Sequence, residues 1–297
     1  MFPVFLVVFN MKIVITGAGG FVGKELAQFF SADHHVLPLT HQALDITDNH
    51  AVKRLITDLR PDLIINCVVL GVDECEANPP LAYSVNSAGP QYLAEAAAEI
   101  DTEIMHLSTN YVFDGNLEPG SFYTIHDAAL PINRYGETKL AGEIAVRQAA
   151  PKSYIVRTSW VFGQGKGNNF FGLAARALME RRRLRAVTDI WASVTYVTDL
   201  VARIAEILAF HRYETYHVVN DGACSYHDFA WEAARELKLS SAEISDLIEA
   251  ATESEMQRRA PRPRYTPMRC LVSEELGLPA LRQWRAALSP YLNGLRG

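Results

Sequence analysis

Short runs of β-branched and aliphatic residues alternate with longer amphipathic segments through the first half of the chain. Strand-length apolar runs occupy residues 12–16, 35–39, 62–66, 103–107 and 153–157. The segments between them carry apolar residues at helical spacing, over residues 20–30, 48–59, 88–99 and 133–149. Strands that alternate with helices favour a parallel sheet with helices on both faces. The first half therefore predicts an α/β fold with a Rossmann-like, doubly wound parallel sheet.

The alternation loosens after Arg157. The pattern there predicts a strand at 215–219 among helices at 169–182, 196–210, 226–237, 242–250 and 280–292. We find neither an internal repeat nor a low-complexity linker. This change of pattern predicts that the chain is divided into a dinucleotide-binding domain over 11–158 and a smaller, mainly helical substrate lobe over 159–297. The lobe is expected to be partly interleaved with the sheet.

The first ten residues read as an N-terminal extension. Their apolar run, 1–9, lacks the basic leader and small-residue cleavage site of a signal peptide, and it is too short to span a membrane. An upstream start of translation is the preferred interpretation, with an added strand or a partner contact as the alternative.

Composition and charge narrow the classes of function. The 297 residues are 49% hydrophobic and 21% charged, and the formal net charge is −6. No overall positive field exists that would attract nucleic acid or an anionic membrane. The cysteines Cys67, Cys75, Cys224 and Cys270 form no Cys-x-x-Cys pair, which argues against structural zinc or a disulfide framework. The sequence thus indicates a cytoplasmic protein with no metal site, and it leaves a homodimer open.

A glycine-rich loop follows the first strand and opens the first helix. It contains Gly17, Gly19, Gly20, Phe21, Val22 and Gly23. A pyrophosphate needs a close backbone approach and a helix N-terminus directed at it, and glycine permits both. The loop therefore predicts a dinucleotide cofactor.

The end of the second strand bears on which cofactor is used. NAD-selective sites usually have an acidic residue there, whereas this chain has His41 within the segment 39–42. The missing carboxylate favours NADP(H), and use of NAD(H) stays open. Asp45 and Ile46 are expected to flank the adenine, although Asp45 is also suited to a turn before the next helix.

Tyr135 and Lys139 are the candidate catalytic pair. They form the one Tyr-x-x-x-Lys in the chain, so a helix places both on the same face. Reduction of a carbonyl needs a proton donor, and a nearby ammonium lowers a tyrosine pKa from its usual value of about 10. Ser108 and Thr109 follow the fourth strand, where an open parallel sheet binds its ligands. A hydroxyl there is expected to orient the carbonyl.

Several motifs together resemble the dTDP-4-dehydrorhamnose reductase family of the extended short-chain dehydrogenase/reductases. The matching segments are 106–115, 134–143, 155–163, 168–170, 196–200 and 216–218, and the resemblance extends from about residue 11 to 292. It implies that NADPH reduces the 4-keto group of a dTDP-linked 6-deoxyhexulose, which gives dTDP-L-rhamnose. In that reaction Thr109 would position the keto oxygen and Tyr135 would protonate it, while Lys139 would tune Tyr135 and hold the cofactor.

The same resemblance implies further binding residues. Asn66, Val68 and Val69, after the third strand, would lie beside the cofactor together with Tyr135 and Lys139. The nucleotide-sugar substrate would contact Ser108, Thr109, Asn110, Tyr135, Trp160 and Arg264. For Trp160 the competing interpretation is a core aromatic residue, and for Arg264 it is a surface loop.

The chain departs from the family pattern at three places. Asn110 stands where the family has aspartate, residues 68–70 replace Ala-Ala-Tyr, and residues 192–195 replace Gly-Ser-Pro-Thr. An amide cannot exchange a proton as a carboxylate does. Two alternatives are therefore kept, namely a non-catalytic, NADP-binding regulatory subunit of the same fold and a nucleotide-sugar 4-epimerase. A dehydratase ranks below them because no acidic residue follows Thr109.

Overall fold

The computed structural model describes residues 10–165 and 169–296. The proposed strand or contact within residues 1–9 and the motif residue Asn168 lie outside this part of the chain. The chain forms two compact units, each built from separate stretches of sequence. The first unit contains the described residues of Met1–Ser108 with Glu137–Val156 and Val201–Thr215, and the second contains those of Thr109–Gly136, Arg157–Leu200 and Tyr216–Gly297. The functional boundary predicted at 158/159 stays a prediction.

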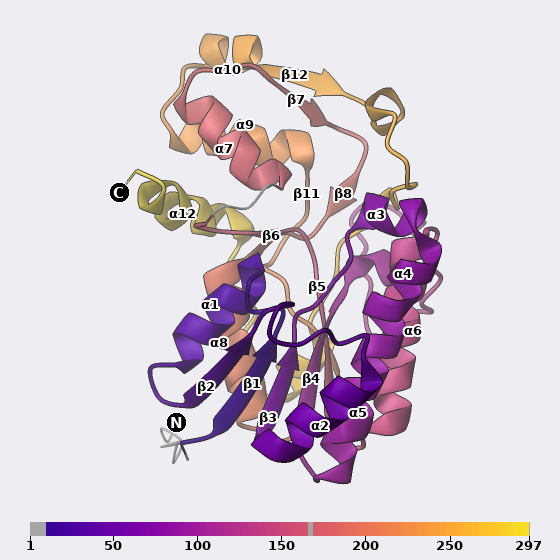
Figure 1. Ribbon diagram of the computed structural model, residues 1–297. Helices are drawn as coiled ribbons and strands as arrows, with labels where there is room; N and C mark the ends of the chain where they lie inside the picture. The colour runs from indigo at the N-terminus through magenta and orange to yellow at the C-terminus, as the bar shows by residue number, and fades with distance from the viewer. Residues whose placement is uncertain (1–9, 166–168, 297) are drawn as a thin grey trace. The chain divides into compact units, whose positions relative to one another are not determined.

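A parallel sheet forms the centre of the first unit (Figure 1). Its strand order is β10-β5-β4-β3-β1-β2. The strands are β1 (Lys12–Thr16), β2 (His35–Leu39), β3 (Leu63–Asn66), β4 (Glu103–Thr109), β5 (Ser153–Thr158) and β10 (Thr215–His217). β1 pairs in parallel with β2 and β3, and β3 pairs in parallel with β4.

Helices cover both faces of this sheet. One face carries α2 (Asn49–Leu59), α5 (Gly89–Glu99) and α6 (Arg134–Ala149), which share a core with Val14, Ile64, Ile104 and Ile155 of the strands. The other face carries α1 (Phe21–Phe30) and α8 (Val197–Leu208) (Figure 1). The predicted doubly wound α/β fold is confirmed.

The helix predicted from residue 88 begins earlier. α3 (Val72–Ala77) is followed by α4 (Pro79–Tyr83), and a π-helical segment, Ser84–Ala88, leads directly into α5. Asn78 caps α4, because its side chain accepts a hydrogen bond from the Leu81 amide, and Pro79 occupies the first helical position. Asn at the N-cap followed by Pro is a typical start of a helix, although the apolar pattern alone predicts no helix before residue 88.

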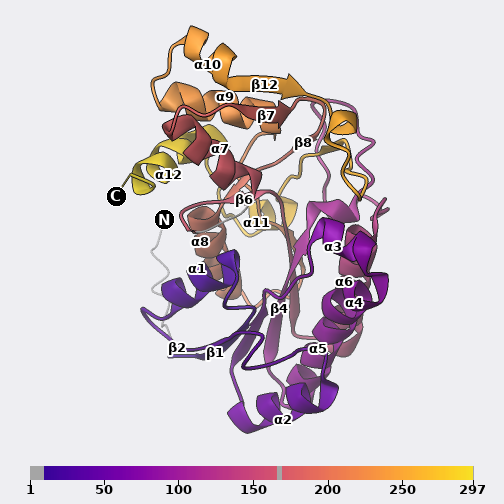
Figure 2. The same ribbon diagram turned by 45° about the horizontal axis from the view of Figure 1, so that its top comes forward.

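Among its described residues, the second unit combines helices with three small sheets. The strands are β6 (Val161–Phe162), β7 (Leu184–Val187), β8 (Trp191–Ala192), β9 (Thr195–Tyr196), β11 (Cys224–Ser225), β12 (Ile248–Ala251) and β13 (Tyr265–Thr266). They pair as β6-β9, β12-β7 and β11-β8-β13. Figure 2 shows β7 and β12 of one of these sheets side by side. The helices are α7 (Phe170–Met179), α9 (Tyr226–Glu236), α10 (Ser241–Leu247), α11 (Leu271–Glu275) and α12 (Leu288–Gly294), with 3₁₀ turns at Asn110–Val112, Glu253–Met256 and Trp284–Ala287. No described helix is both long and apolar enough to traverse a bilayer.

Three predicted helices in this unit end or begin elsewhere. The helix expected over 242–250 was wrong beyond Leu247, because residues 248–251 form β12 and pair with the whole of β7. The helix expected from 280 starts as a 3₁₀ turn at Trp284. α7 ends at Met179, since Arg181 adopts a φ of 55° and the Arg182 amide bonds back to the Ala177 carbonyl at 2.7 Å. A left-handed residue with a backward bond is a common way to end a helix.

Candidate active site

The glycine loop is packed against the residues that follow β3. Gly17 has a φ of 70°, and a β-carbon there would lie 2.8 Å from the Val68 nitrogen. A β-carbon at Gly23 would lie 2.4 Å from the Gly17 carbonyl oxygen. Only glycine lets this turn close so tightly. This tight turn of the backbone is the glycine cradle, and it has the geometry of a loop that a pyrophosphate can approach closely.

The first helix opens toward this loop without a side-chain cap. Gly20 is its N-cap, and the Gly20 amide bonds to the Gly17 carbonyl at 2.9 Å. Phe21 and Val22 are the first helical residues, and no acidic residue lies in the first turn. An uncapped helix N-terminus with no negative side chain suits an anion.

The residues predicted to meet the adenine differ in their surroundings. His41 is exposed. Asp45 accepts hydrogen bonds from the amide and the hydroxyl of Thr47, which lower its pKa. These hydrogen bonds agree with the alternative interpretation of Asp45 as a turn residue before the next helix. Ile46 is buried and packs near Gly89, so the structure places this side chain in the core of the first unit. Contact of these three residues with adenine stays a prediction.

Lys139 lies in a buried polar network of the first unit. Its Nζ donates to the Leu107 carbonyl at 2.7 Å and lies 3.1 Å from Nε2 of His106. The other ring nitrogen of His106 lies 3.1 Å from the amide nitrogen of Asn66. Desolvation lowers the pKa of Lys139 to about 8, while the Glu143 carboxylate opposes the shift. The lysine is thus held close to its point of titration at neutral pH.

Ser108, Val68 and Val69 complete the predicted set in this unit. The Ser108 hydroxyl donates to Glu143, one helical turn after Lys139, and both residues are buried. Val68 is half-buried, and its amide donates to Asn66. Val69 is 51% exposed, which is high for a valine. An exposed apolar side chain after β3 is compatible with the predicted cofactor contact, which stays a prediction.

Tyr135 and Thr109 belong to the second unit. Asn133 caps the first turn of α6, because its side-chain oxygen accepts from the Gly136 amide at 2.8 Å. The Tyr135 ring meets the Tyr111 ring edge-on, with 5.5 Å between the centroids. A β-carbon at Gly136 would lie 2.1 Å from the Tyr111 carbonyl oxygen. Gly136 therefore allows the start of α6 to contact the turn after β4.

The same turn fixes Thr109 and Asn110. The Thr109 hydroxyl accepts a hydrogen bond from the Tyr111 amide at 3.2 Å. Asn110 is buried, and its amide donates to the Thr266 hydroxyl at 2.7 Å. The amide that departs from the family pattern thus ties the end of β4 to β13. Its predicted contact with substrate remains untested.

Trp160 lies in an aromatic and cationic cluster of the second unit. Its ring stacks on Tyr226 at 4.0 Å, and its backbone has a φ of 44°, which is uncommon for a large residue. The Arg258 guanidinium lies 5.5 Å from the Tyr226 ring centroid and pairs with Glu253 at 3.3 Å. Arg258 and Arg262 both lower the raised pKa of Tyr226 through their positive charge, after the larger effect of its burial.

The sequence gives no signal for Tyr226 and Arg258 beside Trp160, and of the segment 262–264 only Arg264 is among the predicted site residues. Tyr226 follows the capping serine of α9, and no periodic pattern surrounds Arg258. Arg264 is exposed and lines a cavity of about 610 Å³ together with Asp189, Trp191, Tyr265 and residues 115–120. The predicted contact of Arg264 with substrate stays a prediction.

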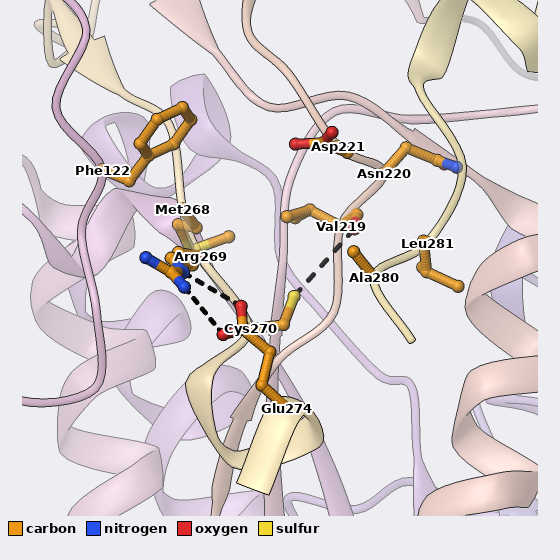
Figure 3. A pocket seen from close by; sticks show the side chains of 10 residues that line it. All are labelled: Phe122, Val219, Asn220, Asp221, Met268, Arg269, Cys270, Glu274, Ala280 and Leu281. Carbon is orange, nitrogen blue, oxygen red and sulfur yellow. Dashed lines mark hydrogen bonds and ion pairs between the residues drawn. The ribbon is translucent and has the colours of Figure 1, made fainter. Parts of the chain in front are cut away.

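A smaller cavity of about 260 Å³ contains none of the predicted site residues (Figure 3). Arg269 and Glu274 form a two-bond ion pair on its wall, at 2.9 and 2.8 Å. Cys270 also lines it, and all four cysteines of the chain are free thiols.

The fold and the glycine cradle define the class of protein, a Rossmann-like protein of the extended short-chain dehydrogenase/reductase type. The family described as RmlD substrate binding domain matches residues 11–296. A dTDP-4-dehydrorhamnose reductase of Mycolicibacterium smegmatis is 38% identical over 98% of this chain and 88% of that protein. The spore coat polysaccharide biosynthesis protein SpsK of Bacillus subtilis is 35% identical over 95% and 96%.

A solved structure agrees. The dTDP-4-dehydrorhamnose reductase of Bacillus anthracis, in complex with NADP, has a TM-score of 0.89 and 31% identity, covering 96% of this chain and 100% of that one. A UDP-glucose 4-epimerase of Thermus thermophilus, at 18% identity and a TM-score of 0.82, shares the fold. The chain therefore belongs to the dTDP-4-dehydrorhamnose reductase family.

Proposed function

We propose that this protein is an NADPH-dependent reductase that converts dTDP-4-dehydrorhamnose into dTDP-L-rhamnose, with Tyr135 as the proton donor. The observation that carries the proposal is the Tyr135–Lys139 pair on α6 within a chain that matches reductases of this name along nearly its full length. A chance Tyr-x-x-x-Lys on a surface helix would not be expected to include a lysine that is 2% exposed.

The glycine cradle supports a dinucleotide as the cofactor. Gly17, Gly20 and Gly23 would hold the pyrophosphate against the N-terminus of α1, where backbone amides and the helix dipole favour negative charge. NADP is preferred because the segment after β2 has no carboxylate beside His41 and because a relative at 31% identity is described as an NADP complex. When bound, the reduced nicotinamide supplies a hydride.

Tyr135 and Thr109 would act on the keto oxygen. The Thr109 hydroxyl hydrogen-bonds to that oxygen and fixes its orientation, and the Tyr135 hydroxyl gives its proton as negative charge develops there. The Lys139 ammonium, one turn along α6, lowers the tyrosine pKa and so eases the loss of that proton. The hydroxyl groups of Thr109 and Tyr135 and the ammonium group of Lys139 are the functional groups that these three roles require.

The cluster around Trp160 is the proposed binding site for the rest of the substrate. Arg258 and Arg262 would neutralise the diphosphate, because guanidinium groups form paired hydrogen bonds to phosphate oxygens. Trp160 and Tyr226 present stacked ring surfaces that suit the apolar face of a deoxy sugar. This supports a nucleotide-linked sugar over a small free ketone.

The decisive experiment compares wild type with Tyr135→Phe in steady-state oxidation of NADPH by dTDP-4-dehydrorhamnose. The variant keeps the ring, so we expect NADPH to bind as before while turnover falls by about 10²–10⁴-fold. If wild type binds NADPH but reduces neither this nor a related 4-keto sugar nucleotide, the non-catalytic alternative replaces the reductase. Tightly retained NAD in the purified protein would instead support the epimerase.

A further inference from the structure

A chain of polar side chains crosses three neighbouring strands beneath Lys139. Thr16 of β1 lies in register with Asn66 of β3, and Asn66 lies in register with His106 of β4. All three residues are buried, at 1%, 0% and 0% exposure. The chain ends at the Lys139 Nζ, 3.1 Å from Nε2 of His106. Every link lies in the first unit.

A fixed backbone donor sets the orientation of the Asn66 amide. The Val68 N–H donates to Oδ1 of Asn66 at 3.1 Å, and the Thr16 hydroxyl donates to the same oxygen at 2.8 Å. A rotated amide would place its N–H groups against the Val68 N–H, two donors facing each other. The Asn66 nitrogen must therefore face His106, and an amide nitrogen can only donate.

The orientation of Asn66 in turn sets the tautomer of His106. Nδ1 of His106 lies 3.1 Å from the donating Asn66 nitrogen, so Nδ1 must be the acceptor. Desolvation, followed by the charge of Lys139, lowers the pKa of His106 well below its usual value, so the ring is neutral. A neutral ring with a bare Nδ1 carries its proton on Nε2, the atom that faces Lys139.

The protonation state of Lys139 decides whether this arrangement is satisfied. A neutral amine has one lone pair to accept the Nε2–H, one N–H for the Leu107 carbonyl, and one N–H left over. An ammonium has three donors and no acceptor. The N–H of an ammonium would face the Nε2–H of His106, so that two donors would oppose each other. If His106 instead carried its proton on Nδ1, the two opposing donors would be the Nδ1–H and the Asn66 amide N–H. Such a conflict inside a protein core is costly.

We infer that Asn66 and His106 are positioning residues that hold an N–H toward the Lys139 side chain and thereby favour its neutral amine. The inference depends on the proposed function only for its consequence in catalysis. The other groups that act on this lysine are Glu143 of α6, which favours the ammonium, and the thiols of Cys67 and Cys75. Burial raises the pKa of Cys67 to about 12, so this thiol stays neutral.

As a consequence, the reductase activity should fall at a lower alkaline pH than it would if Lys139 had the pKa of an ordinary lysine. Tyr135 needs the ammonium form beside it, and the pKa of Lys139 stands at about 8. The reduction rate should then fall as the pH rises through about 8, where the ammonium is lost. A free lysine would keep its charge to about 10.4.

The test measures the titration of Lys139 directly. The full-length protein is labelled with ¹³Cε-lysine, and the Lys139 signal is assigned by its loss in Lys139→Met. In Asn66→Asp the carboxylate still accepts from Val68 and Thr16, and it also accepts from Nδ1–H of His106, which frees Nε2 to accept from the ammonium. In His106→Gln the amide oxygen can turn toward Nζ without adding charge. We expect the pKa of Lys139 to rise by about one unit or more in both variants.

Thr16→Val is the matched control. It removes the far hydroxyl but leaves the Val68 N–H to orient Asn66, so the pKa of Lys139 should stay as in wild type. The carboxylate of Asn66→Asp also raises this pKa through its charge, so the uncharged His106→Gln is the deciding variant. The inference is overturned if Lys139 titrates near its ordinary value in wild type, or if His106→Gln does not raise the pKa of Lys139. Both outcomes are read without substrate, so an inactive protein would contradict the proposed function and leave this result intact. In an active protein, the alkaline limb of kcat/KM should move to higher pH in the same variants.

Discussion

Two glycines of the same loop should respond differently to a single added methyl group. At Gly23 a β-carbon would lie 2.4 Å from backbone, whereas at Gly19 the nearest atom is the Thr40 Cγ2 at 3.6 Å, an ordinary contact. We expect Gly23→Ala to displace the loop and to weaken NADPH binding by about tenfold or more, which is about 1.4 kcal/mol. A fluorescence titration with NADPH measures this. Wild-type affinity in Gly23→Ala would contradict the cradle.

Gly19→Ala tests the cofactor side of the same turn. Its methyl group fits within the protein, so the melting temperature should not change. Loss of NADPH binding in this variant, with an unchanged melting temperature, would place Gly19 against the cofactor. Unchanged binding would remove Gly19 from the predicted cofactor set.

Arg258 and Arg262 make a prediction that separates substrate from cofactor. Hydrogen bonds to charged groups contribute about 1.5–3 kcal/mol, so Arg258→Ala or Arg262→Ala should raise KM for the nucleotide sugar by about 10–100-fold. The affinity for NADPH should not change. Arg259→Ala is the control, because Arg259 is an exposed neighbour of the same type. Equal effects of all three variants would argue against a specific diphosphate site.

At the scale of elements, the start of α6 depends on its contact with the turn after β4. Gly136→Ala would set a methyl group 2.1 Å from the Tyr111 carbonyl oxygen, and the helix would have to move. We expect a loss of about 1–3 kcal/mol in the free energy of unfolding. Because Tyr135 moves with this turn, kcat should fall by about tenfold or more, while KM changes less. Denaturation and steady-state kinetics measure the two effects.

Gln148→Ala serves as the control for this helix, since Gln148 is exposed in the last turn of α6. It should change stability by no more than about 0.5 kcal/mol. If Gly136→Ala keeps wild-type kcat, the position of the first turn of α6 does not limit catalysis.

The elements that could be predicted are those whose pattern is local. The strands β1, β3, β4 and β5 are almost fully buried, so they read as nearly continuous apolar runs, as in residues 13–15. Strands such as β8 and β13 have two residues each, too few for any pattern. Their partners also lie far apart in the sequence, with Trp191 beside Tyr265. Non-local pairing of this kind carries no signal along the chain.

Among the site residues too, those that a local sequence pattern identifies could be predicted, and those that depend on non-local contacts could not. Tyr135 and Lys139 are recognisable because a helix converts a spacing of four into a shared face. The glycine loop is recognisable because backbone geometry demands that residue type. The tautomer of His106 could not be predicted, because it depends on the register of Thr16, Asn66 and His106 across three strands. Nor does any local pattern bring Arg258 to Tyr226.

At the scale of the whole molecule, His217 should govern part of the response of stability to acid. The ring is 1% exposed and lies edge-on to Phe113, with 5.6 Å between centroids. Desolvation, assisted by the charge of Arg157, lowers its pKa to about 3. The folded protein therefore keeps this ring neutral at a pH where an unfolded chain protonates it.

The sign follows from proton uptake. Above pH of about 6.5 the ring is neutral in both states and adds no pH dependence. Below that value the unfolded chain binds a proton that the folded protein does not bind, so the free energy of unfolding falls by about 1.4 kcal/mol per pH unit until the pH approaches the folded pKa.

Between pH 7.5 and 4.5 wild type should lose about 2–3 kcal/mol more than His217→Gln, in which this titration is absent. Urea denaturation at both pH values gives the difference for each protein, and shared contributions such as that of His106 cancel. His50→Gln, at an exposed position, should follow the wild-type pH dependence. Parallel pH curves for wild type and His217→Gln would mean that the ring is protonated in the folded protein and that Arg157 does not prevent it.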